Sequence, residues 1–185
     1  VLGRATGGKR PFRIVTKVPP VKREEIRNED LKHIRKTVEG SIERLRVERL
    51  AGLLMHWPDD LLSPGGEGIY ELMQTLKARG TVEKIGVSVH GVNGPIGEEI
   101  DRLFGRHDFD MIQLPLNVLD QELIHDGHIA ALKRRNVEIH VRSVFLQGLL
   151  LMPLEELDPY FAPLVPVLRD YRRFLDEHGL SPVEA

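Results

Sequence analysis

The chain has 185 residues, a formal net charge of −2 at pH 7 and a pI of about 6.5. This length accommodates one domain with its own hydrophobic core, and the near-balanced charge argues against a nucleic acid or an anionic membrane as partner, since both usually require a basic excess. The sequence has no cysteine, which excludes disulfide bonds and thiolate catalysis and fits a reducing compartment.

Nothing in the sequence predicts a secreted or membrane-bound protein. No signal-peptide pattern opens the chain, and its most apolar stretch, residues 144–154, contains Gln147 and is too short to span a membrane. We therefore expect a cytoplasmic protein with no membrane partner. The sequence gives no indication of its oligomeric state.

The first part of the chain alternates between strand and helix patterns. Residues 1–8 have the composition of a helix end, with two glycines as the stop. Residues 12–18 form a β-branched run that carries Lys17 near its end and is followed by two prolines. Asn28 is expected to cap a helix with an apolar stripe that faces the sheet. The stripe consists of Leu31, Ile34, Val38, Ile42 and Leu45.

Two further strand–helix units follow. Residues 52–55 are an apolar run that ends at His56, and a glycine-rich loop then leads into a helix. The apolar positions of that helix are Ile69, Leu72, Met73 and Leu76. Residues 82–87 form a third strand followed by Ser88, and the next helix starts near Pro95, because proline is tolerated in a first turn.

The remaining units are less regular. Residues 110–114 form a fourth strand that carries Gln113, a helix is expected from about 120 to 135, and residues 137–142 form a fifth strand ending in Arg142. Residues 143–166 are then predicted to be a long, proline-bearing loop, and loops of this length within a domain are usually functional.

A last helix and a helix-start signal close the chain. The helix carries Leu168, Tyr171, Phe174 and Leu175 and stops at Gly179. Beyond it, Ser181, Pro182 and Glu184 have the spacing of a capping box, in which the serine precedes a helix and the glutamate folds back onto it.

The five apolar runs share one property, a polar side chain at the end. Short apolar runs with helical patterns between them predict βαβ units and a parallel sheet. The polar residues are Lys17, His56, Ser88, Gln113 and Arg142. One polar strand end often marks only where the chain surfaces, but ligands bind at the carboxyl ends of parallel strands, so five in succession predict an active-site rim.

The fold class predicted by this pattern is α/β, and specifically part of a (β/α)8 TIM barrel with about five βα units covered. A complete barrel needs about 250 residues. We therefore interpret residues 1–185 as a single domain that lacks N-terminal and C-terminal barrel segments. An open, doubly wound sheet of five strands is the alternative.

Several motifs resemble those of the aldo-keto reductase family, in the same order and across essentially the whole chain. They are IVTKV at residues 14–18, LLMHWPDD at 53–60, LKARG at 76–80 leading into IGVS at 85–88, IQLPLN at 112–117 and LQGLL at 146–150. The resemblance implies a (β/α)8 barrel that binds NADPH and reduces a small-molecule aldehyde or ketone by hydride transfer.

The resemblance also implies a role for each strand-end residue. Lys17 is expected to be the catalytic lysine and His56 the catalytic histidine. Ser88 and Gln113 match positions that hold the carboxamide of the nicotinamide, and Arg142 stands where many members place an aromatic residue that stacks on the nicotinamide. The chain departs from the family pattern at Val89, where an asparagine is usual.

In this family a tyrosine donates the proton that neutralises the developing alkoxide, and a lysine beside the phenol lowers its pKa. The three tyrosines of the chain are Tyr70, Tyr160 and Tyr171, and none of them ends a predicted strand. Members of the family carry this tyrosine, and an aspartate that pairs with the lysine, N-terminal to the segment matched here. The adenosine-phosphate site is expected after the last barrel strand.

Two other functions are compatible with these residues. A catalytically silent, truncated family member would bind a nucleotide or a protein partner without turnover. A barrel aldolase would use Lys17 as a Schiff-base nucleophile, although no other residue points to that chemistry. No metal is expected, because His125 and His128 have no further ligands nearby in sequence and indicate a solvated surface.

Overall fold

The computed structural model describes residues 12–184, so the helix end expected over residues 1–8 lies outside the described residues. The described chain divides into two compact units. Unit 1 comprises residues 12–115 and Gln121–Arg142, and unit 2 comprises Leu116–Asp120 and residues 143–184. The organisation of the chain as one domain stays a prediction.

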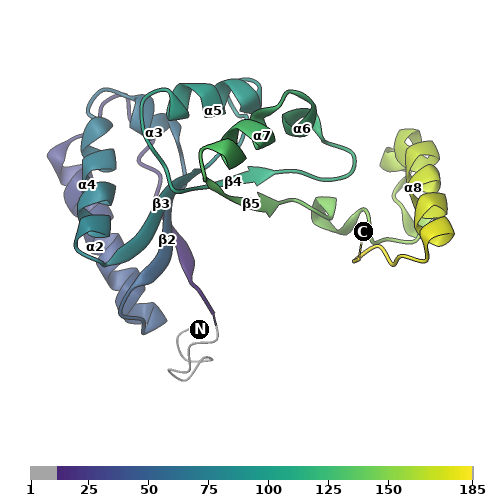
Figure 1. Ribbon diagram of the computed structural model, residues 1–185, viewed down its shortest axis with the longest axis horizontal. Helices are drawn as coiled ribbons and strands as arrows, with labels where there is room; N and C mark the ends of the chain where they lie inside the picture. Colours follow the sequence, from purple (N-terminus) through teal and green to yellow (C-terminus); the bar gives the residue numbers. More distant parts are fainter. Residues whose placement is uncertain (1–11, 185) are drawn as a thin grey trace. The chain divides into compact units, whose positions relative to one another are not determined.

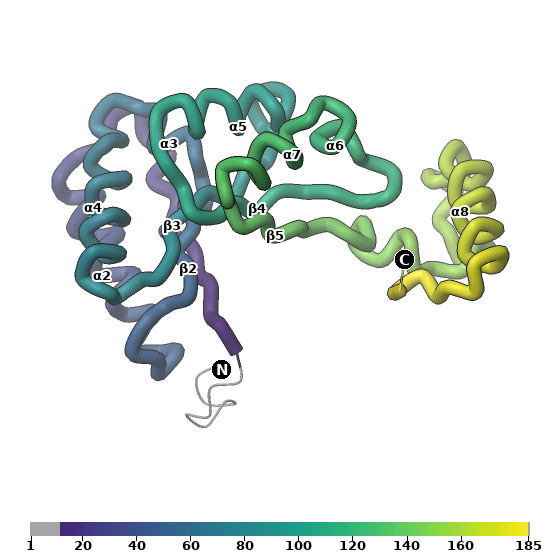
Figure 2. Tube along the Cα trace, in the orientation of Figure 1, coloured from purple at the N-terminus to yellow at the C-terminus, as the bar shows by residue number. Residues whose placement is uncertain are grey.

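Unit 1 is built on a parallel sheet of five strands (Figure 1). The strands are β1 (Val15–Val18), β2 (Leu50–Met55), β3 (Val82–Ser88), β4 (Met111–Pro115) and β5 (Glu138–Arg142). Each strand pairs with the next one in the sequence, in the order β1-β2-β3-β4-β5, as the trace in Figure 2 lets the reader follow. A doubly wound sheet needs a reversal of strand order, so this sequential order excludes that alternative and matches an arc of a (β/α)8 barrel.

Helices connect the strands of unit 1 and cover one side of its sheet. They are α2 (Asn28–Leu45), α3 (Asp59–Leu62), α4 (Glu67–Ala78), α5 (Ile96–Phe104), α6 (Glu122–His125) and α7 (His128–Arg134). Figure 1 shows α2, α4, α5 and α7 on the same side of the curved sheet. Helices on one side only leave the other face of the strands for a barrel interior.

Buried apolar side chains fill the space between the helices and the strands. Met55, Val87 and Ile112 occupy one register row across three strands, and all three are fully buried. The neighbouring row contains Gly86 beside Met111, and a Cβ at Gly86 would lie 2.0 Å from the Met111 carbonyl oxygen. Glycine is therefore required where β3 and β4 pass each other.

The predicted helix over residues 120–135 is wrong as a single element. The structure has two short helices there, α6 and α7, because Gly127 adopts a left-handed conformation with a φ of 81° between them. Glycine enters this region at little cost, and the chain turns instead of continuing the helix. The predicted cap at Asn28 is also displaced by one residue, because Arg27 is the N-cap and its backbone N–H donates to Asp30.

Unit 2 replaces the predicted long loop with short 3-10 turns followed by one helix. The turns are η1 (Leu146–Gly148), η2 (Leu154–Glu156) and η3 (Pro159–Leu164), and the helix is α8 (Val165–His178), which ends at Gly179 with a φ of 63°. A small core of Leu149, Leu150 and Leu168 supports them. The Arg172 guanidinium ties α8 to the turns by donating to the carbonyl oxygens of Leu150 and Met152.

Two further expectations concern the chain beyond α8 and membrane insertion. The glutamate of the predicted capping box does fold back, since Glu184 accepts hydrogen bonds from the backbone N–H and the hydroxyl of Ser181. Within residues 12–184, no helix is long and apolar enough to cross a membrane.

Candidate active site at the carboxyl ends of the strands

Three of the predicted site residues are joined by side-chain hydrogen bonds. Lys17 on β1 donates from Nζ to the Oγ of Ser88 on β3, at 3.2 Å. The Ser88 hydroxyl in turn donates to the Oε1 of Gln113, its register partner on β4, at 3.3 Å. Ser88 is fully buried, so this chain of contacts fixes the three side chains at one edge of the sheet.

The Lys17 ammonium lies in an unfavourable environment. Its hydrogen-bond partner is a neutral hydroxyl, which does not compensate a positive charge as a carboxylate would. Burial, and then the positive charge of Arg142, lower the pKa of Lys17 below its ordinary value. A lysine of this kind presents a charge that can act on a second group brought next to it.

His56 follows the last residue of β2 and is exposed. Partial burial, then the positive charge of Lys17, and then the neighbouring His90 and Lys22 side chains lower its pKa below the ordinary value. The imidazole is therefore neutral at neutral pH, and a neutral imidazole carries one N–H that can donate to a carbonyl oxygen.

Arg142, at the end of β5, contacts residues that follow β3. Its Nη2 donates to the carbonyl oxygen of Val89 at 2.9 Å and lies 3.2 Å from the Nδ1 of His90. The His90 Nε2 is 2.9 Å from the carbonyl oxygen of His56. The five predicted residues thus fall into two bonded sets within unit 1, one of Lys17, Ser88 and Gln113, and one in which His90 joins Arg142 to the backbone of His56.

Two buried carboxylates hold the loops around this edge, and sequence reasoning missed both. Asp60, on α3, accepts from the backbone N–H groups of Val21 and Lys22 at 2.7 and 2.9 Å. Glu99, on α5, accepts from the backbone N–H groups of His90 and Gly91 at 3.1 and 2.8 Å. Both carboxylates therefore order loops that follow strands.

The loop after β1 also reaches the residue next to His56. Burial raises the pKa of the Asp60 carboxyl, against the opposing effect of its two backbone hydrogen bonds. Lys22, held there with a φ of 55°, places its Nζ 3.9 Å from the centre of the Trp57 ring. A cation over an indole face is attracted by the ring, so Asp60 fixes a second positive charge close to His56.

The strand-end residues fit the carboxamide group of a nicotinamide. A primary carboxamide has one acceptor oxygen and an NH2 donor. The Ser88 hydroxyl already donates to Gln113, so its oxygen keeps acceptor capacity, and the Gln113 NH2 remains a donor. The two neighbouring strand ends therefore offer both complements of a carboxamide.

A second polar cluster has two members nearer the starts of their strands, Lys84 and Glu138, and a third, His140, that is the register partner of Gln113. Lys84 on β3 is hydrogen-bonded to Glu138 on β5, whose other oxygen lies 2.6 Å from the Nε2 of His140. Alternate residues of a strand share a face, so Lys84 lies on the same face as Ser88, and Glu138 and His140 on the same face as Arg142. In the sequence, the three residues of this cluster are marked only by lying an even number of positions before Ser88 or Arg142 on the same strand.

None of the three tyrosines ends a strand. The Tyr70 hydroxyl, on α4, donates to the carbonyl oxygen of Asp108 and accepts from Gln74. Tyr160 belongs to η3 and Tyr171 to α8. The proton donor expected from the family resemblance is therefore not among the strand-end residues of the described chain.

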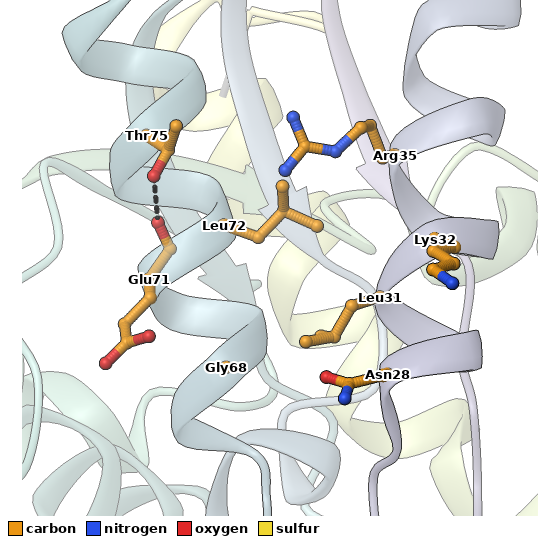
Figure 3. Close-up of a pocket in the computed structure, with 8 residues that line it drawn as sticks. All are labelled: Asn28, Leu31, Lys32, Arg35, Gly68, Glu71, Leu72 and Thr75. Atoms are coloured by element: carbon orange, nitrogen blue, oxygen red, sulfur yellow. Dashed lines mark hydrogen bonds between the residues drawn. The ribbon is translucent and has the colours of Figure 1, made fainter.

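Two cavities of the described chain are lined by other residues. A cavity of about 380 Å³ lies between α2 and α4, where Figure 3 shows Arg35 and Leu72 directed towards each other across it. An apolar cavity of about 470 Å³ in unit 2 is lined by Leu119, Phe145 and Tyr171 among others. Neither cavity is lined by a predicted site residue. The strand ends are the better candidate for the functional site, because they carry the groups that complement a carboxamide.

No metal centre is found within residues 12–184, where no group of three or more histidine, aspartate or glutamate side chains could hold an ion. The two histidines considered in the sequence differ in environment. His125 is exposed, whereas His128 is partly buried with its Nε2 3.6 Å from Asp101.

Comparison with known families gives one match that covers almost the whole chain. The model described as the Aldo/keto reductase family matches residues 1–184. An uncharacterized oxidoreductase of Bacillus subtilis (strain 168), YcsN, is 41% identical over 69 residues, which are 37% of this chain and 22% of that protein.

Solved structures with a similar fold are also aldo-keto reductases by description. The glycerol dehydrogenase AKR11B4 from Gluconobacter oxydans is 25% identical, with a TM-score of 0.70 over 98% of this chain and 60% of that one. AKR11C1 from Bacillus halodurans is 22% identical, with a TM-score of 0.67 over 91% of this chain and 54% of that one.

A third structure contains a cofactor. It is an aldo/keto reductase from Klebsiella pneumoniae in complex with NADP and acetate, 18% identical, with a TM-score of 0.64 over 98% of this chain and 56% of that one. The chain thus spans between half and two thirds of the length of these three solved structures. The identities of 22% and 18% establish the fold alone.

Proposed function

Since the chain belongs to the aldo/keto reductase family, we propose that it is the central part of an NADPH-dependent oxidoreductase that reduces an aldehyde or ketone to an alcohol. The observation that carries the proposal is the hydrogen-bonded series Lys17, Ser88 and Gln113 at the strand ends. It joins a lysine of lowered pKa to two side chains that complement a carboxamide.

In this proposal Ser88 and Gln113 hold the carboxamide of the cofactor, and Arg142 lies beside its nicotinamide. The geometry supports the pairing because the two side chains belong to register partners on adjacent strands. When bound, NADPH supplies the hydride that is transferred to the carbonyl carbon. The NADP found in the Klebsiella pneumoniae relative is consistent with this choice of cofactor.

Lys17 and His56 would act on the oxygen of the carbonyl group. Hydride addition to the carbon leaves negative charge on that oxygen, which must receive a proton. The neutral His56 would donate a hydrogen bond to the oxygen and orient it. The Lys17 ammonium would favour ionisation of a tyrosine proton donor supplied from outside the described residues, and so lower the pKa of the phenol.

The test is NADPH consumption by the full-length natural protein with a panel of aldehydes and ketones, combined with a titration of NADPH binding by fluorescence. The proposal predicts tight NADPH binding and carbonyl-dependent oxidation of the cofactor. Absence of both NADPH binding and turnover would contradict the proposal.

The second candidate is a catalytically silent protein that binds a nucleotide or a protein partner. The observation that favours it is the absence of a tyrosine at the strand ends of the described chain. The same experiment separates the two, because a silent protein would bind NADPH but oxidise none with any carbonyl of the panel.

A further inference from the structure

His90 makes contacts that determine which of its ring nitrogens carries the proton. Its Nε2 is 2.9 Å from the carbonyl oxygen of His56, which can only accept, so Nε2 carries the hydrogen. Its Nδ1 is 3.2 Å from the Nη2 of Arg142, and a guanidinium can only donate, so Nδ1 carries none. His90 is therefore neutral in this geometry, with its proton on Nε2.

The backbone and the ring of His90 are held from three directions. Glu99, 7% exposed, accepts from the backbone N–H groups of His90 and Gly91. The imidazole stacks on the indole of Trp57, with the two ring planes 27° apart. These contacts fix the imidazole between the end of β2, where His56 lies, and the end of β5, where Arg142 lies.

We propose that His90 is a positioning residue that couples Arg142 to the strand end carrying His56, through a neutral imidazole that bonds to both. The inference rests on the proposed carbonyl reduction and deepens it. His90 would not touch the substrate. It would hold the Arg142 guanidinium at the place where its charge acts on Lys17, and it would fix the backbone next to the imidazole of His56.

The charges around the ring explain why the coupling needs the neutral form. The groups around it are the Arg142 guanidinium on β5, the His56 imidazole after β2 and the Lys22 ammonium, which lies over the ring of Trp57. The Glu99 carboxylate faces the backbone of His90. A second proton would enter at Nδ1, directly opposite a cationic donor, and would break the bond to Arg142.

Three variants in the full-length protein separate the effect of the bond between His90 and Arg142 from that of the bond between His90 and the His56 carbonyl. His90→Asn keeps an acceptor close to the position of Nδ1, His90→Gln keeps a donor close to the position of Nε2, and His90→Ala keeps neither. His33→Ala, at an exposed position of α2, is the control. Steady-state kinetics are measured across the pH range, and folding is checked by circular dichroism.

We expect His90→Ala to lower kcat roughly tenfold to a hundredfold with a smaller effect on KM, as displaced reaction geometry does. Its basic pH limb should move to higher pH, because an Arg142 that keeps its bond to the Val89 carbonyl but loses the one to His90 is held less firmly and lowers the pKa of Lys17 less. His90→Asn should restore the wild-type position of the basic limb and most of kcat, whereas His90→Gln should restore neither. His33→Ala should match the wild type.

The proposal is overturned if His90→Ala keeps kcat within about twofold of wild type with an unmoved basic limb, well below the losses that displaced groups cause. It is also overturned if the asparagine and glutamine variants are indistinguishable, and this comparison decides the matter should the alanine variant fail to fold. A wild type without any reductase activity would instead refute the proposed function. Nitrogen NMR of the His90 ring would then still test the bonding, with a hydrogen on Nε2 expected and one on Nδ1 contradicting it.

Discussion

Two lysines on the same face of the sheet have different hydrogen-bond partners. Lys17, at the strand ends, donates to the hydroxyl of Ser88. Lys84, nearer the start of β3, is paired with the carboxylate of Glu138, which also binds His140. A lysine paired with a carboxylate has its charge compensated within the fold, whereas a lysine on a neutral hydroxyl keeps its charge available for a reacting group. The first arrangement favours stability and the second favours chemistry.

The pKa shifts follow the same division. Burial and the nearby Arg142 lower the pKa of Lys17, which makes its charged form less favourable. Hydrogen bonds from Lys84 and His140 lower the pKa of Glu138 to about 2, which makes its charged form more favourable. The strand-end cluster, defined as Lys17, Ser88 and Gln113, thus contains a lysine whose charged form is disfavoured, whereas the strand-body cluster, defined as Lys84, Glu138 and His140, contains a glutamate whose charged form is favoured.

The largest predicted effect distinguishes the histidines of the two regions. His56→Ala should lower kcat by roughly 100-fold to 1000-fold, because it removes a donor to the developing oxyanion. His140→Ala, in the strand-body cluster, should lower kcat far less, because His140 is bonded to Glu138 and contributes mainly to stability. Steady-state kinetics and urea unfolding of both variants provide the measurement. Equal losses of kcat in the two variants would contradict the proposed difference between His56 and His140.

A smaller effect is expected when the charge next to Lys17 is removed. Arg142→Ala should raise the pKa of Lys17, since the positive charge of Arg142 is one cause of its lowering. Lysine is charged below its pKa, so activity that depends on the ammonium should extend to higher pH. A pH–rate profile of the variant checks this, and a basic limb that moves to lower pH would show that Arg142 acts on another group.

The smallest effect belongs to the strand-body cluster. Glu138→Gln should cost about 1 kcal/mol of unfolding free energy at neutral pH, because the side chain is 39% exposed and solvent screens the pair. The folded pKa of about 2 lies below the ordinary glutamate pKa of 4.5, so this stability is present above pH 4.5 and is lost as the pH falls towards 2. Urea unfolding at several pH values tests it, and a cost independent of pH would argue for lost packing.

The sheet and the five strand-end residues could be predicted because they follow local patterns. Apolar runs followed by a polar residue indicated each strand, although β4 continues past Gln113 to Pro115, and the parallel order β1-β2-β3-β4-β5 confirms the barrel arc. The break at Gly127 was missed because a single glycine within a predicted helix can either continue the helix or adopt a left-handed conformation that ends it. In β1 the strand begins at Val15 and not at residue 12, since Phe12 is exposed.

The groups that support the site could not be predicted for a different reason. Asp60 binds backbone groups 38 and 39 residues away, and Lys84 pairs with a glutamate 54 residues away. Such partners are brought together by strand register, which the sequence does not contain before the strands are aligned. His90 lay two residues after Ser88 with no motif of its own, and only its contacts distinguish it.

The most direct test of the account is a comparison of Lys17→Met with Lys84→Met in the full-length protein. Both substitutions remove one ammonium from the same face of the sheet, so they differ only in position and in the partner that the ammonium leaves behind. NADPH-dependent reduction of the best carbonyl substrate and the unfolding midpoint in urea are measured for each. The account predicts that Lys17→Met abolishes reduction with little change in midpoint, and that Lys84→Met retains reduction with a lower midpoint. Retained reduction in Lys17→Met would contradict it.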